Sequence, residues 1–210
     1  MKYNIFRIPF GGEPHHMNPL TNRKLQAQNT KNKIYKASIE LFEKKGYENL
    51  KIKDICKEAG VSIGSFYNHF DSKHAILIEV HKKADEYFKT EVKDNIISTN
   101  GIDKIIEFFD YYSIYNDFVG LDTLKQLYHS GNCFFSENGR YLQVLLQKII
   151  LEGQGKKEVT PTMTAEEICN HLFISARGVC YDWCINDGSY DLVEFMHKHI
   201  SLIAESFKIN

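Results

Sequence analysis

The chain has 210 residues, of which 43% are hydrophobic and 25% charged, and its formal net charge is −1 at pH 7. This length suits one or two domains of roughly 50–200 residues each, and the composition is typical of a globular chain. A membrane-spanning helix is excluded, because no apolar stretch approaches the roughly 20 residues that a bilayer requires. The first residues also lack the apolar core of a signal peptide, so we expect a cytoplasmic protein.

Charge is distributed unevenly along the chain. Residues 22–83 carry 13 Lys and Arg against 7 Asp and Glu, a net charge of +6, whereas residues 84–210 carry 11 against 19, a net charge of −8. A surface that binds phosphates needs local positive potential and not a high overall pI. The first segment therefore favours nucleic-acid binding, with an ordinary solvated mixture of charges as the alternative.

Residues 1–29 are polar, contain several Pro and Gly, and show no periodicity, which predicts a flexible N-terminal arm. It is either a solvated tail or an arm whose Arg23 and Lys24 reach a minor groove. From Thr30 the pattern becomes helical, and Gly46 ends the helix. Its predicted inner face consists of Ile34, Ala37, Ser38, Leu41 and Phe42.

Two short helices follow at close spacing. The first is expected from about Ile52 to Ala59, and Gly60 then permits a tight turn because glycine accepts a positive φ cheaply. Ser62 stands where an N-cap belongs and opens a third helix that runs through Phe70. A fourth helix, from Lys73 to about Val92, is expected to connect this region to the rest of the chain.

Further helices are predicted near residues 102–117, 119–130, 136–153, 164–186 and 190–208. Strand-like alternation is not sustained anywhere, so the fold class is all-α. The helices divide into two expected domains, one at residues 30–75 and one at residues 76–210.

Two short helices joined by a glycine turn, after a longer helix, are the sequence form of a three-helix DNA reader. The stretch IKDICKEAGVSIGSFYNHFDSKHAIL resembles the N-terminal DNA-binding domain of the TetR family of repressors, and the resemblance runs from about Lys33 to Val80. It implies a helix-turn-helix DNA-binding domain at residues 30–75, with phosphate contacts from Tyr67, His69 and Lys73. Candidates for base or nearby backbone contacts on the recognition helix are Ser62, Ile63, Gly64, Ser65 and Asn68, and Lys51 and Lys53 complete the predicted DNA-binding set.

Two positions depart from the family pattern. Lys51 replaces the threonine usual at the head of the second helix, and an ammonium cannot cap by accepting an N–H bond. Ile63 replaces a residue that is commonly polar, which favours contact with a thymine methyl group.

The two C-terminal helices carry more apolar residues than one buried face needs, including Phe173, Ile174, Cys180, Tyr181, Phe195 and Leu202. In the family the corresponding helices form a four-helix bundle between protomers, which implies a homodimer. Residues 76–210 are thus expected to form a helical ligand-binding and dimerisation domain. Aromatic residues concentrate between residues 102 and 183 and suit either an effector pocket or a core. The predicted ligand-binding residues are Phe108, Tyr111, Tyr112, Tyr115, Tyr128, His129, Phe134 and Trp183.

Three other classes of protein compete with a small-molecule-responsive repressor. An enzyme is not expected, because no phosphate loop or nucleophile motif is present, and we expect no catalytic residue, cofactor or metal. A redox- or metal-responsive DNA-binding regulator would use Cys180 and Cys184 with His197 and His199, although we expect the cysteines to be reduced and mostly buried. A helical module that binds protein and not DNA is disfavoured by the basic first segment.

Overall fold

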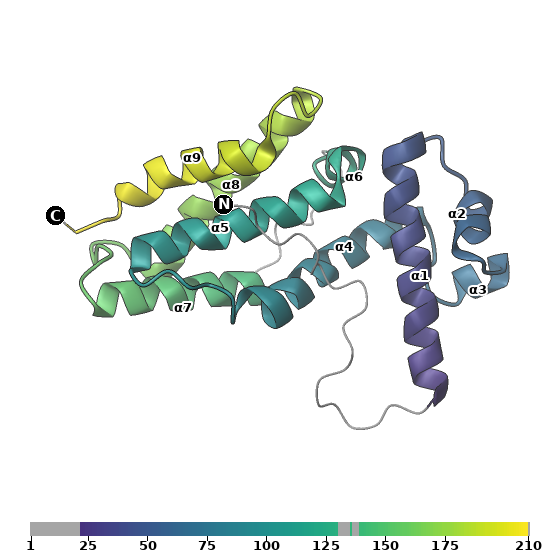
Figure 1. Ribbon diagram of the computed structural model, residues 1–210, viewed down its shortest axis with the longest axis horizontal. Coiled ribbons are helices and arrows are strands. Elements are labelled where there is room, and N and C mark those ends of the chain that lie inside the picture. Colours follow the sequence, from purple (N-terminus) through teal and green to yellow (C-terminus); the bar gives the residue numbers. More distant parts are fainter. Residues whose placement is uncertain (1–21, 130–134, 136–138, 210) are drawn as a thin grey trace. The chain divides into compact units, whose positions relative to one another are not determined.

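The computed structural model of the protein describes residues 22–129, 135 and 139–209. The described residues are predominantly helical, and their one β-bridge, between Val159 and Lys208, is isolated from any strand (Figure 1). The predicted all-α class is therefore confirmed. None of the described helices is both long and apolar enough to cross a membrane.

The chain divides into two compact units, residues 1–83 and 84–210, which we call the N-terminal unit and the C-terminal unit. The division falls inside a helix, eight residues later than the boundary expected after residue 75. The helices of the N-terminal unit are α1 (Asn22–Lys45), α2 (Ile52–Ala59), α3 (Ile63–Tyr67) and most of α4 (Lys73–Tyr87). Those that follow are η2 (Phe88–Val92), α5 (Gly101–Val119), α6 (Leu121–Leu127), α7 (Tyr141–Gly155), α8 (Ala165–Ile185) and α9 (Leu192–Glu205).

Helix α1 begins at Asn22, eight residues before the expected start at Thr30. Residues 22–29 are exposed on every side, so no apolar period marks them as a helix. This stretch nevertheless holds strong helix formers such as Arg, Lys, Leu, Gln and Ala. The expectation of a flexible arm is thus corrected for residues 22–29, and residues 1–21 lie outside the described part.

The core of the N-terminal unit forms where the sequence predicted it. All five residues of the predicted inner face of α1 are buried. Phe66 of α3 and Phe70 after it are buried as well, with their ring centroids 5.9 Å apart. An ion pair between Lys31 and Glu79, with 2.7 Å between Nζ and Oε2, links α1 to α4. The short α3 is therefore anchored in the core by the side chain of Phe66, which contacts Phe70.

The connecting helix has the predicted extent but changes its winding. The hydroxyl of Ser72 accepts a hydrogen bond from the backbone N–H of Ala75 at 3.2 Å, as a cap should. The last turn is the π-helix η2, in which the N–H of Lys93 donates to the carbonyl of Phe88 at 3.1 Å. Phe88 and Val92 of this turn are fully buried, so the wider turn directs both side chains into the core of the C-terminal unit.

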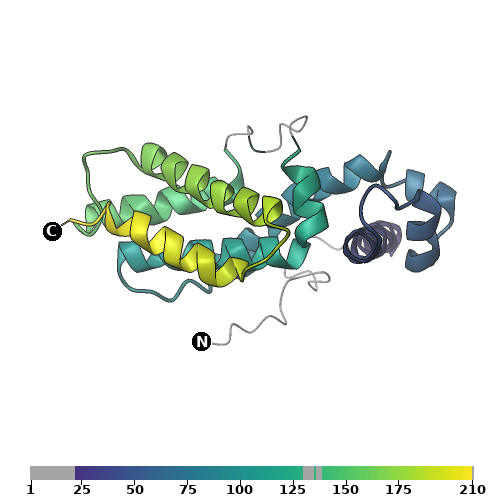
Figure 2. The ribbon, with the colours of Figure 1, turned by 90° about the horizontal axis from the view of Figure 1, so that it is seen from above.

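Helix α5 is the centre of the C-terminal unit and packs against α6, α7, α8 and α9. Helices α8 and α9 lie side by side (Figure 2). Aromatic rings fill much of the interior: Phe108 lies with its centroid 4.7 Å from Phe88, 5.2 Å from Phe109 and 6.1 Å from Phe173. The aromatic density seen in the sequence is therefore in large part a core.

The start of α5 and the end of α7 approach each other at two glycines. A Cβ on Gly153 would lie 2.6 Å from Cγ2 of Val159, and a Cβ on Gly101 would lie 2.9 Å from Cα of Gly153. Real Cβ atoms do not come this close to their neighbours. Both positions therefore require glycine for the approach of the helices.

We expect Gly153→Ala to lower the free energy of unfolding by about 1–3 kcal/mol, the usual cost of overpacking. This loss outweighs the gain of roughly 0.5–1 kcal/mol that alanine brings to a helix. Gly155→Ala in the same helix is the control, because a Cβ there meets nothing within 4 Å. Urea unfolding followed by circular dichroism measures both, and an unchanged midpoint for Gly153→Ala would contradict the packing assigned to this site.

Candidate nucleic-acid interface and effector pocket

The turn between α2 and α3 is built from local signals. Gly60 has φ of 66°, in the left-handed region, and the N–H of Val61 donates to the carbonyl of Cys56 at 3.0 Å to close α2. The hydroxyl of Ser62 accepts a hydrogen bond from the N–H of Ser65 at 3.1 Å and caps α3. The predicted helix-turn-helix is therefore present, although α3 ends at Tyr67 and not at Phe70.

Helix α3 exposes most of its surface. Phe66 is its one buried residue, whereas Ile63 is 54% exposed and Tyr67 is 51% exposed. These two lie four residues apart, so they share one side of the helix. A Cβ on Gly64 would meet only the hydroxyl of Ser62, at 3.9 Å. The small residue at position 64 thus has no packing role within the described chain, and an external surface explains it better.

The other predicted DNA-binding residues of α2 and the end of α3 are accessible. Lys51, Lys53 and Asn68 are exposed, and His69 is partly buried. The side chain of Lys51 forms no cap, as expected, and the carboxylate of Asp54 instead accepts a hydrogen bond from the backbone N–H of Lys51 at 3.2 Å. The ammonium of Lys51 is thereby not needed to begin α2.

Lys73 is tethered beside the end of α1. Its Nζ donates to the carbonyl of Tyr47 at 2.6 Å and lies 4.5 Å from the centroid of the Tyr47 ring. An ammonium has three donors, so one hydrogen bond and a cation–π contact leave it able to donate to a phosphate. The tether limits the freedom of this long side chain and holds its charge near the start of α4.

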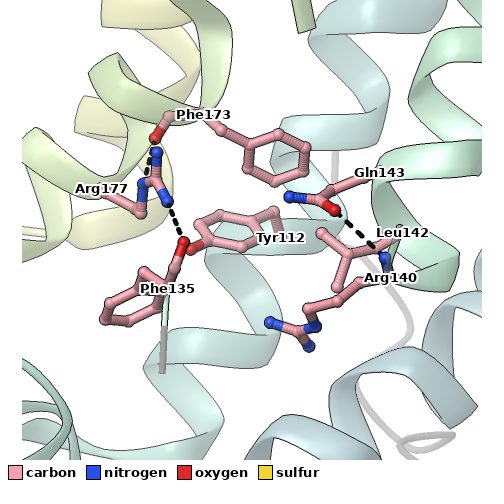
Figure 3. Close-up of a pocket in the computed structure, with 7 residues that line it drawn as sticks. All are labelled: Tyr112, Phe135, Arg140, Leu142, Gln143, Phe173 and Arg177. Carbon is pink, nitrogen blue, oxygen red and sulfur yellow. Dashed lines mark hydrogen bonds between the residues drawn. The ribbon is translucent and has the colours of Figure 1, made fainter. Parts of the chain in front are cut away.

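The C-terminal unit contains a small, partly open hollow lined by Tyr112, Phe135, Arg140, Leu142, Gln143, Phe173 and Arg177 (Figure 3). Its walls come from α5, α7 and α8 together with Phe135 and Arg140, which precede α7 in the chain. Burial raises the pKa of Tyr112, and the positive charges of Arg177 and Arg140 lower it in part. The hollow therefore combines aromatic surface with two guanidinium groups.

Most of the predicted ligand-binding residues lie elsewhere in the C-terminal unit. Of those that the structure describes, Tyr112 alone lines the hollow, and Tyr128 stacks on the lining residue Phe135 with ring centroids 4.7 Å apart. The hydroxyl of Tyr111 donates to the carbonyl of Asn95. Phe108 lies in the core, and Tyr115 stacks on Tyr87. His129 is exposed, and the indole N–H of Trp183 donates to the carbonyl of Tyr190. Phe134 lies outside the described residues.

The two arginines of the hollow are not among the residues predicted from the sequence. A signal was available, because the chain has four arginines in all and Arg140 and Arg177 are the two beyond residue 83. Arg177 donates from Nε to the carbonyl of Phe173 and from a terminal nitrogen to that of Phe135, both at 3.0 Å (Figure 3). Arg140 donates from Nε to the carboxylate of Asp85 at 3.1 Å.

The cysteines do not form a sensor site in the described chain. Cys56, Cys169, Cys180 and Cys184 are free and buried. His197 contacts Asp110, with 2.9 Å between Nδ1 and Oδ1, whereas His199 stacks on Phe195, so the two histidines face different neighbours. No group of three potential metal ligands occurs among the described residues. A redox- or metal-responsive mechanism is therefore not favoured.

We expect the thiols of α8 to react slowly. Burial raises the pKa of Cys180 to about 12 and that of Cys184 to about 11. Since the thiolate is the nucleophile, alkylation at pH 8 is expected to be at least about 100-fold slower in the native protein than in urea. Mass spectrometry after timed exposure to iodoacetamide measures this, and comparable native and unfolded rates would restore the thiol-sensor alternative.

The N-terminal unit contains the match to a known protein family. Residues 34–80 match a family model described as bacterial regulatory proteins, tetR family. The HTH-type transcriptional regulator UidR of Escherichia coli is 28% identical over 88 residues, which are 42% of this chain and 45% of UidR, so the chain spans less than half of that relative. The HTH-type transcriptional repressor NicS of Pseudomonas putida is 25% identical over 187 residues, which are 83% of this chain and 84% of NicS.

A solved structure extends the likeness to the fold of both units. The transcriptional regulator FadR from Bacillus subtilis, in complex with stearoyl-CoA, has a TM-score of 0.69 and 22% sequence identity. The likeness covers 83% of this chain and 98% of the FadR chain. At this identity it is the arrangement of helices that is shared.

Proposed function

We propose that the chain is a sequence-specific, DNA-binding transcriptional regulator of the cytoplasm, because residues 34–80 match the model of the tetR family of bacterial regulatory proteins. It binds double-stranded operator DNA as a homodimer and acts as a repressor that a small-molecule effector releases. The exposed side of α3 carries this proposal. The side chains of Ile63 and Tyr67 project from the protein surface there, and Gly64 beside them has no packing role. No catalytic activity is proposed.

The roles of the single residues follow from their placement. Tyr67, His69 and Lys73 contact phosphates, and Ile63 contacts a thymine methyl group in the major groove. Gly64 lets the recognition helix lie close to the base edges. The net charge of +6 over residues 22–83 supplies the long-range attraction to DNA, with Lys51 and Lys53 near the contact surface.

The homodimer forms through α8 and α9. Large apolar side chains are exposed along both helices: Ile174, Tyr181 and Ile185 on α8, and Phe195 and Leu202 on α9. Ile174, Tyr181 and Ile185 recur at helical spacing and so occupy one side of α8. A second copy of these two helices would cover the exposed apolar surface and set two recognition helices about 34–36 Å apart, as successive major grooves require.

The effector binds in the hollow of the C-terminal unit. The solved structure of FadR from Bacillus subtilis is a complex with stearoyl-CoA, and a small-molecule effector for this chain is in keeping with that likeness. Helix α4 offers a route for the signal, because it begins at Lys73 in the N-terminal unit and carries Asp85, which contacts Arg140 of the hollow. An effector that alters this contact would act on the helix that also holds Lys73.

Binding of the purified protein to its own upstream intergenic DNA, measured across a salt series, tests the proposal. We expect tight binding with the stoichiometry of a dimer, and a steep decrease of affinity with salt as phosphate contacts release counterions. The protein could bind this DNA no more tightly than random duplexes. If a selection from random sequences then also yields no preferred site, a sequence-specific regulator is excluded.

A further inference from the structure

The charge in the effector hollow is concentrated in two arginines. Three aromatic residues, Leu142 and Gln143 supply the rest of the lining, and no carboxylate is among its described lining residues (Figure 3). The C-terminal unit as a whole carries a net charge of −8. The lining of the hollow is therefore positively charged although the C-terminal unit as a whole is negatively charged.

The guanidinium of Arg177 donates its hydrogen bonds to neutral backbone carbonyls. Its two hydrogen bonds go to the backbone carbonyls of Phe173 and Phe135, and its guanidinium lies 5.8 Å from the centroid of the Phe135 ring. Among the described residues it pairs with no carboxylate. A guanidinium has five N–H donors, so two hydrogen bonds hold its plane in place and leave donors for a bound anion.

Arg140 already takes part in an anion-binding arrangement. One oxygen of the Asp85 carboxylate accepts from Nε of Arg140 at 3.1 Å, and the other accepts from the backbone N–H of Leu142, in the first turn of α7, at 3.3 Å. A guanidinium beside the N-terminal amides of a 15-residue helix is a favourable position for a carboxylate. The protein's own Asp85 demonstrates that a carboxylate fits there.

We propose that the effector is an organic acid with a flat apolar body. The proposal rests on the proposed function, because it names the chemistry of the molecule that the hollow binds. The rings of Tyr112, Phe135 and Phe173 hold the apolar body, and Arg177 attracts the carboxylate. The acid then competes with Asp85 for Arg140 and the first turn of α7, and so releases Asp85 at the end of α4.

The experiment compares three probes with the same bicyclic body: 2-naphthoate, the neutral 2-naphthamide and 2-naphthyl phosphate. Isothermal titration calorimetry on the intact protein measures each affinity. We expect 2-naphthoate to bind at least about tenfold more tightly than 2-naphthamide, because only the acid forms charged hydrogen bonds with the arginines. Equal affinity of these two probes, or no binding of either at about 10 mM, would overturn the proposal. If 2-naphthyl phosphate binds most tightly, the preferred ligand is a phosphate ester and not a carboxylic acid, and the proposal is also overturned.

Variants test the two parts of the site separately. Arg177→Gln is expected to lower the affinity for 2-naphthoate at least about tenfold. Asp85→Asn is expected to raise this affinity, because the side chain that competes with the acid for Arg140 loses its charge. Lys148→Gln removes an exposed charge from α7 and should change nothing. Unaltered affinity in folded Arg177→Gln, or weaker affinity in folded Asp85→Asn, would contradict the proposal. If a variant does not fold, the comparison of acid and amide on the unmodified protein decides.

Operator binding is measured on the same preparations without any probe, which separates the two claims. Specific DNA binding with no preference for the acid would refute the organic acid alone. Acid binding that depends on Arg177, in a protein without any specific DNA binding, would refute the regulator and leave the ligand site standing.

Discussion

Gly64→Leu is expected to abolish sequence-specific DNA binding without loss of stability. The backbone at position 64 is helical, and a Cβ there would meet nothing closer than the hydroxyl of Ser62 at 3.9 Å, so the fold can accept a larger residue. Leucine is also a better helix former than glycine. On the DNA side, its side chain would hold the recognition helix away from the base edges, and affinity should fall to the non-specific level, a loss of about 10³-fold or more.

Fluorescence anisotropy with labelled operator DNA measures this loss, and thermal melting measures the stability. Tyr67→Phe and Tyr67→Ala are informative companions, because the first removes only the hydroxyl that would donate to phosphate and the second removes the ring as well. Tyr67 is 51% exposed, so neither change should destabilise the fold strongly. Operator affinity unchanged in folded Gly64→Leu would show that α3 does not enter the groove.

The second large effect is expected from Leu202→Glu combined with Ile174→Glu. These residues are 78% and 62% exposed, on α9 and α8 respectively, so a charge at either position is well solvated in a single copy of the chain. In a dimer interface the same carboxylates would be buried without partners, which is strongly unfavourable. We expect a folded monomer, and an operator affinity lower by about 10³-fold or more, because only one half-site is then bound at a time.

Val144→Glu is the matched control, since it also places an acid at a partly exposed apolar residue, 37% accessible, but on α7. Sedimentation equilibrium gives the oligomeric state, and the same anisotropy assay gives the affinity. A double variant that stays dimeric would place the interface away from α8 and α9, and a control that dissociates would place it on α7.

The location of the helix-turn-helix could be predicted from the sequence because its causes are local. Gly60 permits a left-handed turn and Ser62 caps the next helix, and each acts within a few residues of its place in the chain. The buried face of α1 follows from a period of apolar residues in the same way. The start of α1 was missed because residues 22–29 are helical but exposed on all sides, so the apolar period that marks an amphipathic helix is missing.

The hollow was decided by the tertiary structure alone. Arg177 lies 37 positions after Arg140 along the chain, and Asp85 lies 55 positions before it, and only the packing of helices brings these side chains together. Nothing local distinguishes an aromatic residue that lines a hollow from one that fills a core, because both are apolar positions on the inner side of a helix. Phe108 and Tyr112 stand one turn apart on α5, yet the first is enclosed by aromatic rings and the second borders the hollow. The sequence by itself therefore determined the helix-turn-helix, whose geometry is set by neighbouring residues, whereas the hollow depends on contacts between residues far apart in the chain.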